Sequence, residues 1–205
     1  MSQGTWGKGW THFMPFEKGG NSYYVAYNSL YGHANLDRIN SAGNGGNTIW
    51  QGSWSKSWTH LEPFDLDGVQ YFLAYQASTG AMEIDKVTGS GNSISINEDS
   101  ASTWTKGWSH IVPIGHHGDV HLLLYRASTG EAKFAKVRPG GEGVDTLATE
   151  SWGKPWTAFS PFTKGGDGHF LTYKAGTGQV IVEKLAYHGN GSTTIWSDWW
   201  TLGWA

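Results

Sequence analysis

A tryptophan pair, Trp-x-x-x-Trp, recurs five times along this chain at nearly constant intervals. The pairs are Trp6/Trp10, Trp54/Trp58, Trp104/Trp108, Trp152/Trp156 and Trp200/Trp204. Their first tryptophans follow one another after 48, 50, 48 and 48 residues. Self-similarity at such a period is typical of propellers, solenoids and repeat arrays. The repeats span 6–53, 54–103, 104–151 and 152–199, and a partial closing copy spans 200–205.

Each repeat reads as four short strands joined by tight turns. In the first repeat, an apolar run ends in Pro15-Phe16, an aromatic run ends at Tyr27, and later runs cover 36–39 and 48–50. Short runs of β-branched and aromatic residues bounded by Gly, Asn, Asp and Ser are strand signals. No window holds a sustained 3.6-residue apolar period, so the sequence predicts no helix of normal length.

Consecutive four-stranded antiparallel units are the sequence pattern of a β-propeller. We therefore predict an all-β, four-bladed β-propeller that occupies residues 1–205 as one domain. A β-trefoil needs three units and fits poorly. A solenoid is the remaining architecture, although solenoids usually have shorter turns and atypical end repeats.

Composition excludes several classes of function. The chain has no cysteine, which rules out disulfides, thiolate metal sites and a cysteine nucleophile. The net charge of −3, with signs interspersed, argues against a nucleic-acid partner. No apolar stretch is long enough to insert into a membrane. No signal peptide is visible at the N-terminus, so we expect a cytoplasmic protein or one released without a leader.

The blade pattern resembles that of tachylectin-type propeller lectins. Gly9-Trp10 with Phe13, and Gly107-Trp108 with Ile111, carry the likeness, followed by a Gly turn, an aromatic run, a second Gly turn and a basic return strand. Those lectins have five blades, whereas this chain has four repeats, a number that resembles hemopexin-like propellers. The resemblance implies a non-enzymatic protein with one sugar pocket per repeat, often for N-acetylated sugars.

The tryptophan pairs are the first candidates for such pockets. The chain has 13 tryptophans, more than we expect a core of this size to absorb. Indole faces can stack on the C–H patches of a sugar while nearby polar groups bind its hydroxyls. The predicted carbohydrate-binding tryptophans are Trp6, Trp10, Trp54, Trp58, Trp104, Trp108, Trp152 and Trp156. The alternative is that the second tryptophan of each pair wedges between blades as core.

Two polar series accompany the tryptophans. The return strand carries a basic residue in every repeat, Arg38, Lys86, Lys136 and Lys184, which could donate to a ligand or form a structural ion pair. A histidine precedes the apolar run in three repeats, as His12, His60 and His110, and Ala158 replaces it in the fourth. Three imidazoles near a propeller axis could bind a metal. A hydrogen bond within the blade or to a ligand is the preferred interpretation, so no metal and no cofactor are predicted.

Catalytic signatures are absent from the sequence. It contains no Gly-x-Ser-x-Gly elbow, no P-loop and no His-Glu-x-x-His motif. No carboxylate holds one position through all four repeats. The sequence therefore predicts a multivalent lectin that binds glycans on cell surfaces, not an enzyme, and allows a homo-oligomer. The alternatives are a protein-interaction or axial ion-binding propeller without sugar binding, and an idealised engineered repeat.

Five tryptophan pairs cannot occupy equivalent places in a ring of four blades. We expect Trp200 to end the fourth blade and Trp10 to begin the first. Trp6 and Trp204 would then be spare, at a ring seal or an oligomer contact.

Overall fold

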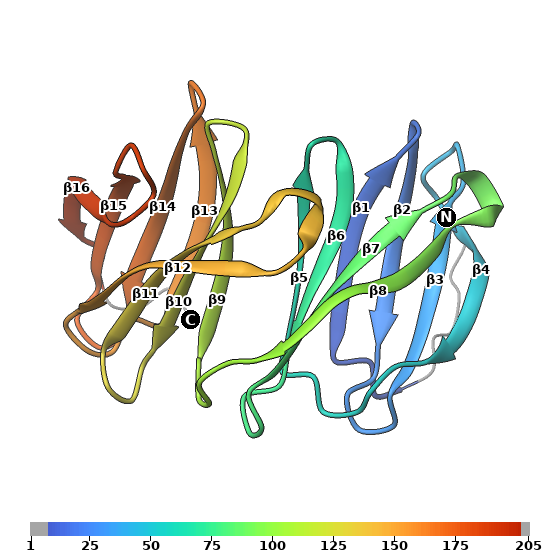
Figure 1. The fold of residues 1–205 in the computed structure, drawn as a ribbon, viewed down its shortest axis with the longest axis horizontal. Helices are drawn as coiled ribbons and strands as arrows, with labels where there is room; N and C mark the ends of the chain where they lie inside the picture. Colours follow the sequence, from blue (N-terminus) through green and yellow to red (C-terminus); the bar gives the residue numbers. More distant parts are fainter. Residues whose placement is uncertain (1–7, 202–205) are drawn as a thin grey trace. The chain divides into compact units, whose positions relative to one another are not determined.

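The computed structural model describes residues 8–201, so Trp6 and Trp204 lie outside the described residues. Sixteen strands form four separate four-stranded antiparallel sheets (Figure 1). The predicted all-β, four-bladed propeller fold is confirmed. Two short 3₁₀ turns, η1 (Gly91–Ser93) and η2 (Pro139–Gly141), are the helical segments within residues 8–201. Neither has the length and apolar character that a membrane crossing requires.

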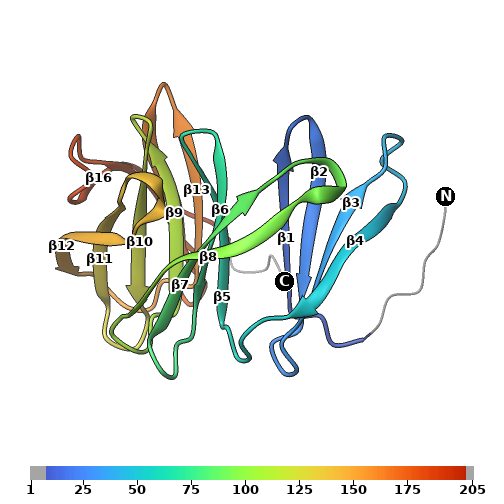
Figure 2. The same cartoon turned by 45° about the vertical axis from the view of Figure 1, so that its right-hand side comes forward.

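The chain divides into two compact units, residues 1–104 and 105–205, each with two blades. The prediction of one domain over 1–205 stays a prediction. In unit 1, blade 1 contains β1 (His12–Lys18), β2 (Asn21–Tyr27), β3 (His33–Ile39) and β4 (Gly46–Ser53), and blade 2 contains β5 (His60–Leu66), β6 (Val69–Tyr75), β7 (Ala81–Thr88) and β8 (Ser95–Thr103). Figure 2 shows the strands of blade 1 following one another across their sheet.

Unit 2 repeats this plan. Blade 3 contains β9 (His110–His116), β10 (Asp119–Arg126), β11 (Glu131–Val137) and β12 (Val144–Ser151), and blade 4 contains β13 (Ala158–Lys164), β14 (Asp167–Lys174), β15 (Gln179–Leu185) and β16 (Ser192–Trp199). Within unit 2, β9 lies against β13 and β14 of the next blade (Figure 1). In unit 1, β1 lies against β5 and β6 in the same way. The first strand of one blade therefore meets the first two strands of the next.

Apolar side chains on facing sheets fill the space between the two blades of each unit. In unit 1 the cluster joins Met14 and Tyr27 of blade 1 to Trp58 and Phe72 at blade 2. In unit 2 it joins Tyr125 and Phe134 of blade 3 to Trp156 and Phe170 at blade 4. Large aromatics dominate these clusters because each buries a large apolar area.

A register shift recurs in all four blades between the third and fourth strands. It falls at Leu36/Asp37, Ile84/Asp85, Phe134/Ala135 and Val182/Glu183. A β-bulge bends a strand and redirects the side chains beside it. In blade 4 the bulge leaves Glu183 opposite Thr194, whose hydroxyl donates to the Glu183 carboxylate at 2.5 Å.

Candidate functional site

The two tryptophans of each pair have different places in the structure. The second tryptophan is buried in three repeats, with exposed fractions of 3% for Trp58, 1% for Trp108 and 7% for Trp156. This is the predicted alternative in which it packs as core, and Trp10 departs from it because it is half-buried. The first tryptophan is half-buried in the three complete pairs, at Trp54, Trp104 and Trp152. Among the described residues, the two tryptophans of a complete pair therefore differ in burial.

The first tryptophans follow the last strand of a blade and cover its central tyrosine. Ring centroids lie 5.9 Å apart for Trp54 and Tyr27 and 6.2 Å apart for Trp152 and Tyr125. Trp200 has the same place on blade 4, 5.9 Å from Tyr173, as expected for the residue that ends that blade.

Each basic residue of the return strands contacts a residue of its own blade, and Arg38 also contacts the next one. Lys136 Nζ lies 2.6 Å from Asp119 Oδ2, and Lys184 Nζ lies 2.6 Å from Asp167 Oδ2. The other two have neutral partners. Arg38 donates to the side-chain carbonyl of Asn21 at 2.5 Å and also to that of Asn92, in a loop of blade 2, at 3.2 Å. Lys86 Nζ lies 5.6 Å from the centroid of the Tyr71 ring.

Two of the repeated histidines contact the next blade of their own unit. His12 Nε2 contacts the Thr59 carbonyl oxygen at 3.3 Å, and His110 Nε2 contacts that of Thr157 at the same distance. His60 Nδ1 lies 2.9 Å from the Thr59 hydroxyl. The His110 ring is half-buried, and this burial lowers its pKa. The preferred sequence interpretation is a hydrogen bond inside the blade or to a ligand. The contact of His60 is of the first kind, whereas the Nε2 contacts of His12 and His110 join neighbouring blades.

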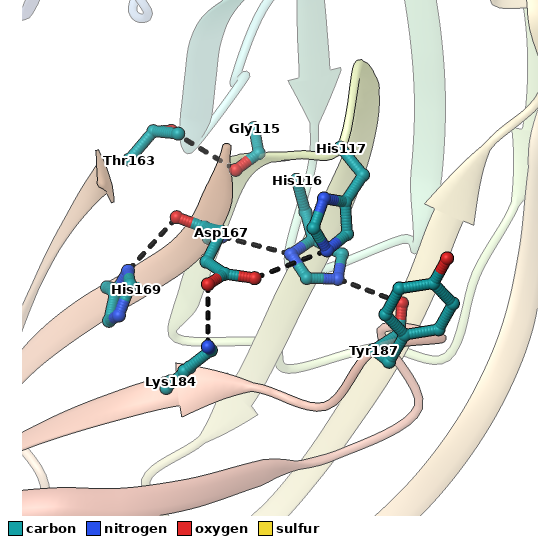
Figure 3. A network of polar contacts seen from close by, with 9 residues as sticks. Gly115, His116, His117, Thr163, Asp167, His169, Lys184 and Tyr187 are labelled. Carbon is teal, nitrogen blue, oxygen red and sulfur yellow. Dashed lines mark hydrogen bonds and ion pairs between the residues drawn. The ribbon is translucent and has the colours of Figure 1, made fainter. Parts of the chain in front are cut away.

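A second group of histidines, which sequence reasoning missed, gathers in unit 2 (Figure 3). His116 ends β9, His117 occupies the turn after it, and Asp167 begins β14 of the next blade. Their ligand atoms lie within 4.8 Å of one another, a spacing that a metal ion could use. The packing of β9 against β14 brings the three residues together.

Hydrogen bonds decide how the buried His116 can act. Its Nδ1 accepts the Gly168 backbone N–H at 3.0 Å, and its Nε2 lies 3.0 Å from the Tyr187 carbonyl oxygen (Figure 3). A carbonyl only accepts, so Nε2 carries the proton and both ring nitrogens are engaged. His116 would have to give up the Gly168 N–H to bind a metal through Nδ1. As folded, it is a bridge between blades 3 and 4.

His117 is free to act as a base. Its Nε2 lies 3.2 Å from Asp167 Oδ1, and its side chain is 40% exposed (Figure 3). A lone pair that faced this carboxylate would be repelled, so Nε2 carries the proton and Nδ1 of the neutral ring holds the lone pair. The turn holds His117 at a φ of 53°, and its backbone N–H donates to the Gly166 carbonyl oxygen at 2.8 Å. The imidazole is therefore anchored on one side and open on the other.

Lys184 sets the charge state of Asp167. The hydrogen bond from Lys184 lowers the pKa of the Asp167 carboxyl, and the positive charge of Lys184 lowers it further. Asp167 therefore stays ionised at neutral pH and can stabilise a positive charge on His117. We call His117, Asp167 and Lys184 the His–Asp–Lys group.

The signal for this group was present in the sequence as a departure from the repeat. His117 stands where Gly19, Asp67 and Gly165 stand in the other repeats. A comparison based on residues common to all four repeats gives no weight to a position at which one repeat differs. That these residues meet across a blade junction depends on packing, which sequence spacing alone does not give.

Solved structures that share this fold include two that bear gluconolactonase names. The chain matches a candidate 6-phosphogluconolactonase from Bacteroides fragilis with a TM-score of 0.62 and 13% identity, over 92% of this chain and 57% of that one. It matches a periplasmic gluconolactonase from Pseudomonas aeruginosa with a TM-score of 0.57 and 15% identity, over 85% and 50%. A Lactobacillus plantarum protein matches with a TM-score of 0.59 and 14% identity, over 85% and 53%.

The chain thus spans about half the length of the solved structures it matches. At these identities the likeness concerns the fold. No family model and no curated protein matches the chain.

These findings correct two predictions from the sequence. The multivalent lectin and the absence of enzymatic activity are both contradicted, because two of the matched structures bear gluconolactonase names. The tachylectin-type resemblance is likewise not supported. The physical reason lies in the repeat itself, since three of the four second tryptophans are core residues and two of the four basic residues, Lys136 and Lys184, form ion pairs within their blades.

Proposed function

We propose that this chain hydrolyses a cyclic ester of the sugar-lactone class, with His117 as general base. The observation that carries the proposal is the His–Asp–Lys group, in which one carboxylate contacts both an imidazole and an ammonium group. The names of the matched structures, gluconolactonase and 6-phosphogluconolactonase, support the choice of substrate class.

Water is the nucleophile in this reaction. The His117 Nδ1 lone pair takes a proton from water while the water oxygen bonds to the lactone carbonyl carbon. A positioned base of this kind contributes about 10²–10⁴-fold to the rate. Asp167 stabilises the imidazolium through its contact with Nε2.

The same groups complete the reaction. Lys184 has three N–H donors and uses one toward Asp167, so another can donate to the tetrahedral oxyanion. The ring C–O bond then breaks, and the leaving alkoxide takes the proton back from His117. The products are the open hydroxy acid and an unchanged enzyme.

The test is a pH-stat assay of the full chain with D-glucono-1,5-lactone and with its 6-phospho derivative, each against spontaneous hydrolysis in the same buffer. We expect His117→Gln to lower kcat/KM roughly 10³-fold, because the base is lost while the turn is kept. The control is His33→Gln, since His33 is exposed in unit 1 and stacks on Tyr31. A wild-type rate no greater than the spontaneous rate on both lactones would show that the proposal is wrong.

A further inference from the structure

A pocket of about 230 Å³ lies in unit 2, where the end of blade 3 meets blade 4. Its walls include Glu150, Trp152, Trp156, Thr172, Glu183 and Thr194. None of these residues belongs to the His–Asp–Lys group. We call this space the Glu150–Glu183 pocket.

Two carboxylates without counter-ions face this pocket. Glu150 Oε2 accepts the Trp152 indole N–H at 2.7 Å, and Glu183 Oε1 accepts the Thr194 hydroxyl at 2.5 Å. The second carboxylate oxygen of each glutamate therefore remains available to accept a hydrogen bond from a ligand. Neither forms an ion pair with any residue in the part of the chain that the structure describes. Half-buried carboxylates of this kind favour a cationic ligand.

A buried hydroxyl also lines the pocket without a partner. Thr172 is 1% exposed, and its Oγ1 has no hydrogen-bond partner among residues 8–201. A buried polar group without a partner costs free energy, so its persistence calls for an explanation. A ligand with an N–H donor would supply the missing bond.

Indole rings complete the walls. Trp152 is half-buried and Trp156 is buried at 7% exposure. Indole faces attract cations as well as apolar groups. Lys174 already uses this property, because its Nζ lies 5.4 Å from the Trp156 ring centroid, yet it does not pair with either glutamate.

The equivalent junction of unit 1 is built differently. Gly52 takes the place of Glu150 there, and a Cβ added at Gly52 would lie 2.1 Å from an atom of the Trp50 ring. Blade 3 has Ala148 in place of Trp50. In unit 1 the Trp50 ring lies in the space beside Gly52. In unit 2 the corresponding residues are Ala148 and Glu150, so the wall of the pocket is acidic where that of unit 1 is aromatic.

We propose that the Glu150–Glu183 pocket binds a small organic molecule through a primary ammonium group. Its N–H donors match the two free carboxylate oxygens and the Thr172 hydroxyl, while its apolar portion packs against Trp152. A quaternary ammonium lacks the donors, and a neutral alcohol lacks the charge. This binding is separate from the lactone chemistry, so either proposal can fail without the other.

The test uses three probes of related shape on the full-length protein: benzylamine, benzyl alcohol and benzyltrimethylammonium. The readout is the ¹H–¹⁵N resonance of the Trp152 indole N–H, which contacts Glu150. We expect a saturable shift with benzylamine and at least about tenfold weaker binding of the other two, since hydrogen bonds to charged groups contribute about 1.5–3 kcal/mol. Equal binding of benzyl alcohol, or no saturable shift with benzylamine, would overturn the proposal.

Substitutions separate binding from folding. Glu183→Gln should weaken benzylamine binding at least about tenfold, and Thr172→Val should weaken it about fivefold. Because Thr172→Val removes a hydroxyl without a partner, its melting temperature should equal or exceed that of the wild type. The matched control is Glu142→Gln, an exposed carboxylate of unit 2 outside the pocket. Unchanged affinity in Glu183→Gln would also reject the proposal.

Discussion

The two units share one design at the junction between their blades but differ in the side chains placed on it. In unit 1, Lys18 at the end of β1 donates to the Val87 carbonyl oxygen of blade 2 at 3.1 Å. In unit 2, the equivalent His116 at the end of β9 donates to the Tyr187 carbonyl oxygen of blade 4 at 3.0 Å. A flexible ammonium group and a buried imidazole thus make the same kind of connection between neighbouring blades.

The next residue along the chain gives the two junctions different chemistry. His117 stands where the first blade of unit 1 has Gly19, and Asp167 stands where its second blade has Val69. Both turns hold their residue at positive φ, 53° for His117 and 58° for Gly19. The backbone position is therefore the same, and two substitutions turn an ordinary hairpin end into a base with its own carboxylate. The two units thus share the backbone of the junction, and the candidate site arises from residues that differ at its turns.

The largest effect should come from removing the carboxylate that unit 1 lacks. Asp167→Asn should lower kcat on the lactone substrate by about 10³-fold, because an amide neither holds the Nε2–H tautomer of His117 nor stabilises its imidazolium. The measurement is steady-state kinetics with saturating lactone. A loss confined to KM would show that Asp167 contributes to binding alone.

Blade 3 offers a matched control for this variant. Asp119 forms the same 2.6 Å ion pair with Lys136 that Asp167 forms with Lys184. Asp119→Asn removes an equivalent ion pair outside the His–Asp–Lys group, so kcat should change less than about twofold, as expected for a partly exposed pair. Equal losses in the two variants would mean that general damage to the blades, not the loss of a catalytic carboxylate, explains the effect.

The units should also respond to pH in opposite directions. In unit 2, burial of His121, with smaller contributions from His116 and Lys136, lowers its pKa from 6.5 to about 4. The unfolded chain then binds more protons than the folded one between these values. The free energy of unfolding of unit 2 should therefore fall as pH drops from 6.5 to 4, by at most about 3 kcal/mol.

In unit 1, burial raises the pKa of Glu62 to about 7, and burial together with the charges of Glu83 and Glu98 raises that of Asp85 to about 7. Here the folded chain binds more protons, so the free energy of unfolding should rise as pH drops from 7 toward 4. Hydrogen exchange followed by mass spectrometry reports each unit separately. His121→Tyr should flatten the response of unit 2, and Asp85→Asn should reduce that of unit 1 to the contribution of Glu62. Parallel responses in both units would contradict this prediction.

The fold could be predicted from the sequence because every repeat carries the same local signals. The runs ending at Tyr27, Tyr75, Tyr125 and Tyr173 all form second strands, and the glycines between runs occupy turns at positive φ, such as Gly32 and Gly130. These signals act over a few residues, and four copies reinforce one another. Even the core role of Trp58 and Trp108 was among the alternatives that the pattern allowed.

The candidate site could not be predicted in the same way. His117 and Asp167 are 50 positions apart and meet because β9 packs against β14, a contact between blades that strand patterns do not specify. The lectin prediction weighted what the repeats share, whereas the His–Asp–Lys group depends on His117, which no other repeat has. In a repeat protein, candidate catalytic residues should therefore be sought first at the positions that differ between copies.

The smallest expected difference concerns the tyrosines at the centre of each unit. The Tyr27 hydroxyl donates to the Ser55 carbonyl oxygen at 2.7 Å, whereas that of Tyr125 donates to the Gly153 carbonyl oxygen at 3.3 Å. Tyr27→Phe should lower the free energy of unfolding of unit 1 by about 2 kcal/mol, and Tyr125→Phe should lower that of unit 2 by about 1 kcal/mol. The loss is smaller in unit 2 because a longer hydrogen bond is weaker and its removal costs less free energy. Hydrogen exchange in each unit is the measurement, with the exposed Tyr31→Phe as control. A larger loss in unit 2 would mean that the amide of Trp156, which donates to the Tyr125 hydroxyl at 3.2 Å, matters more than the carbonyl contact.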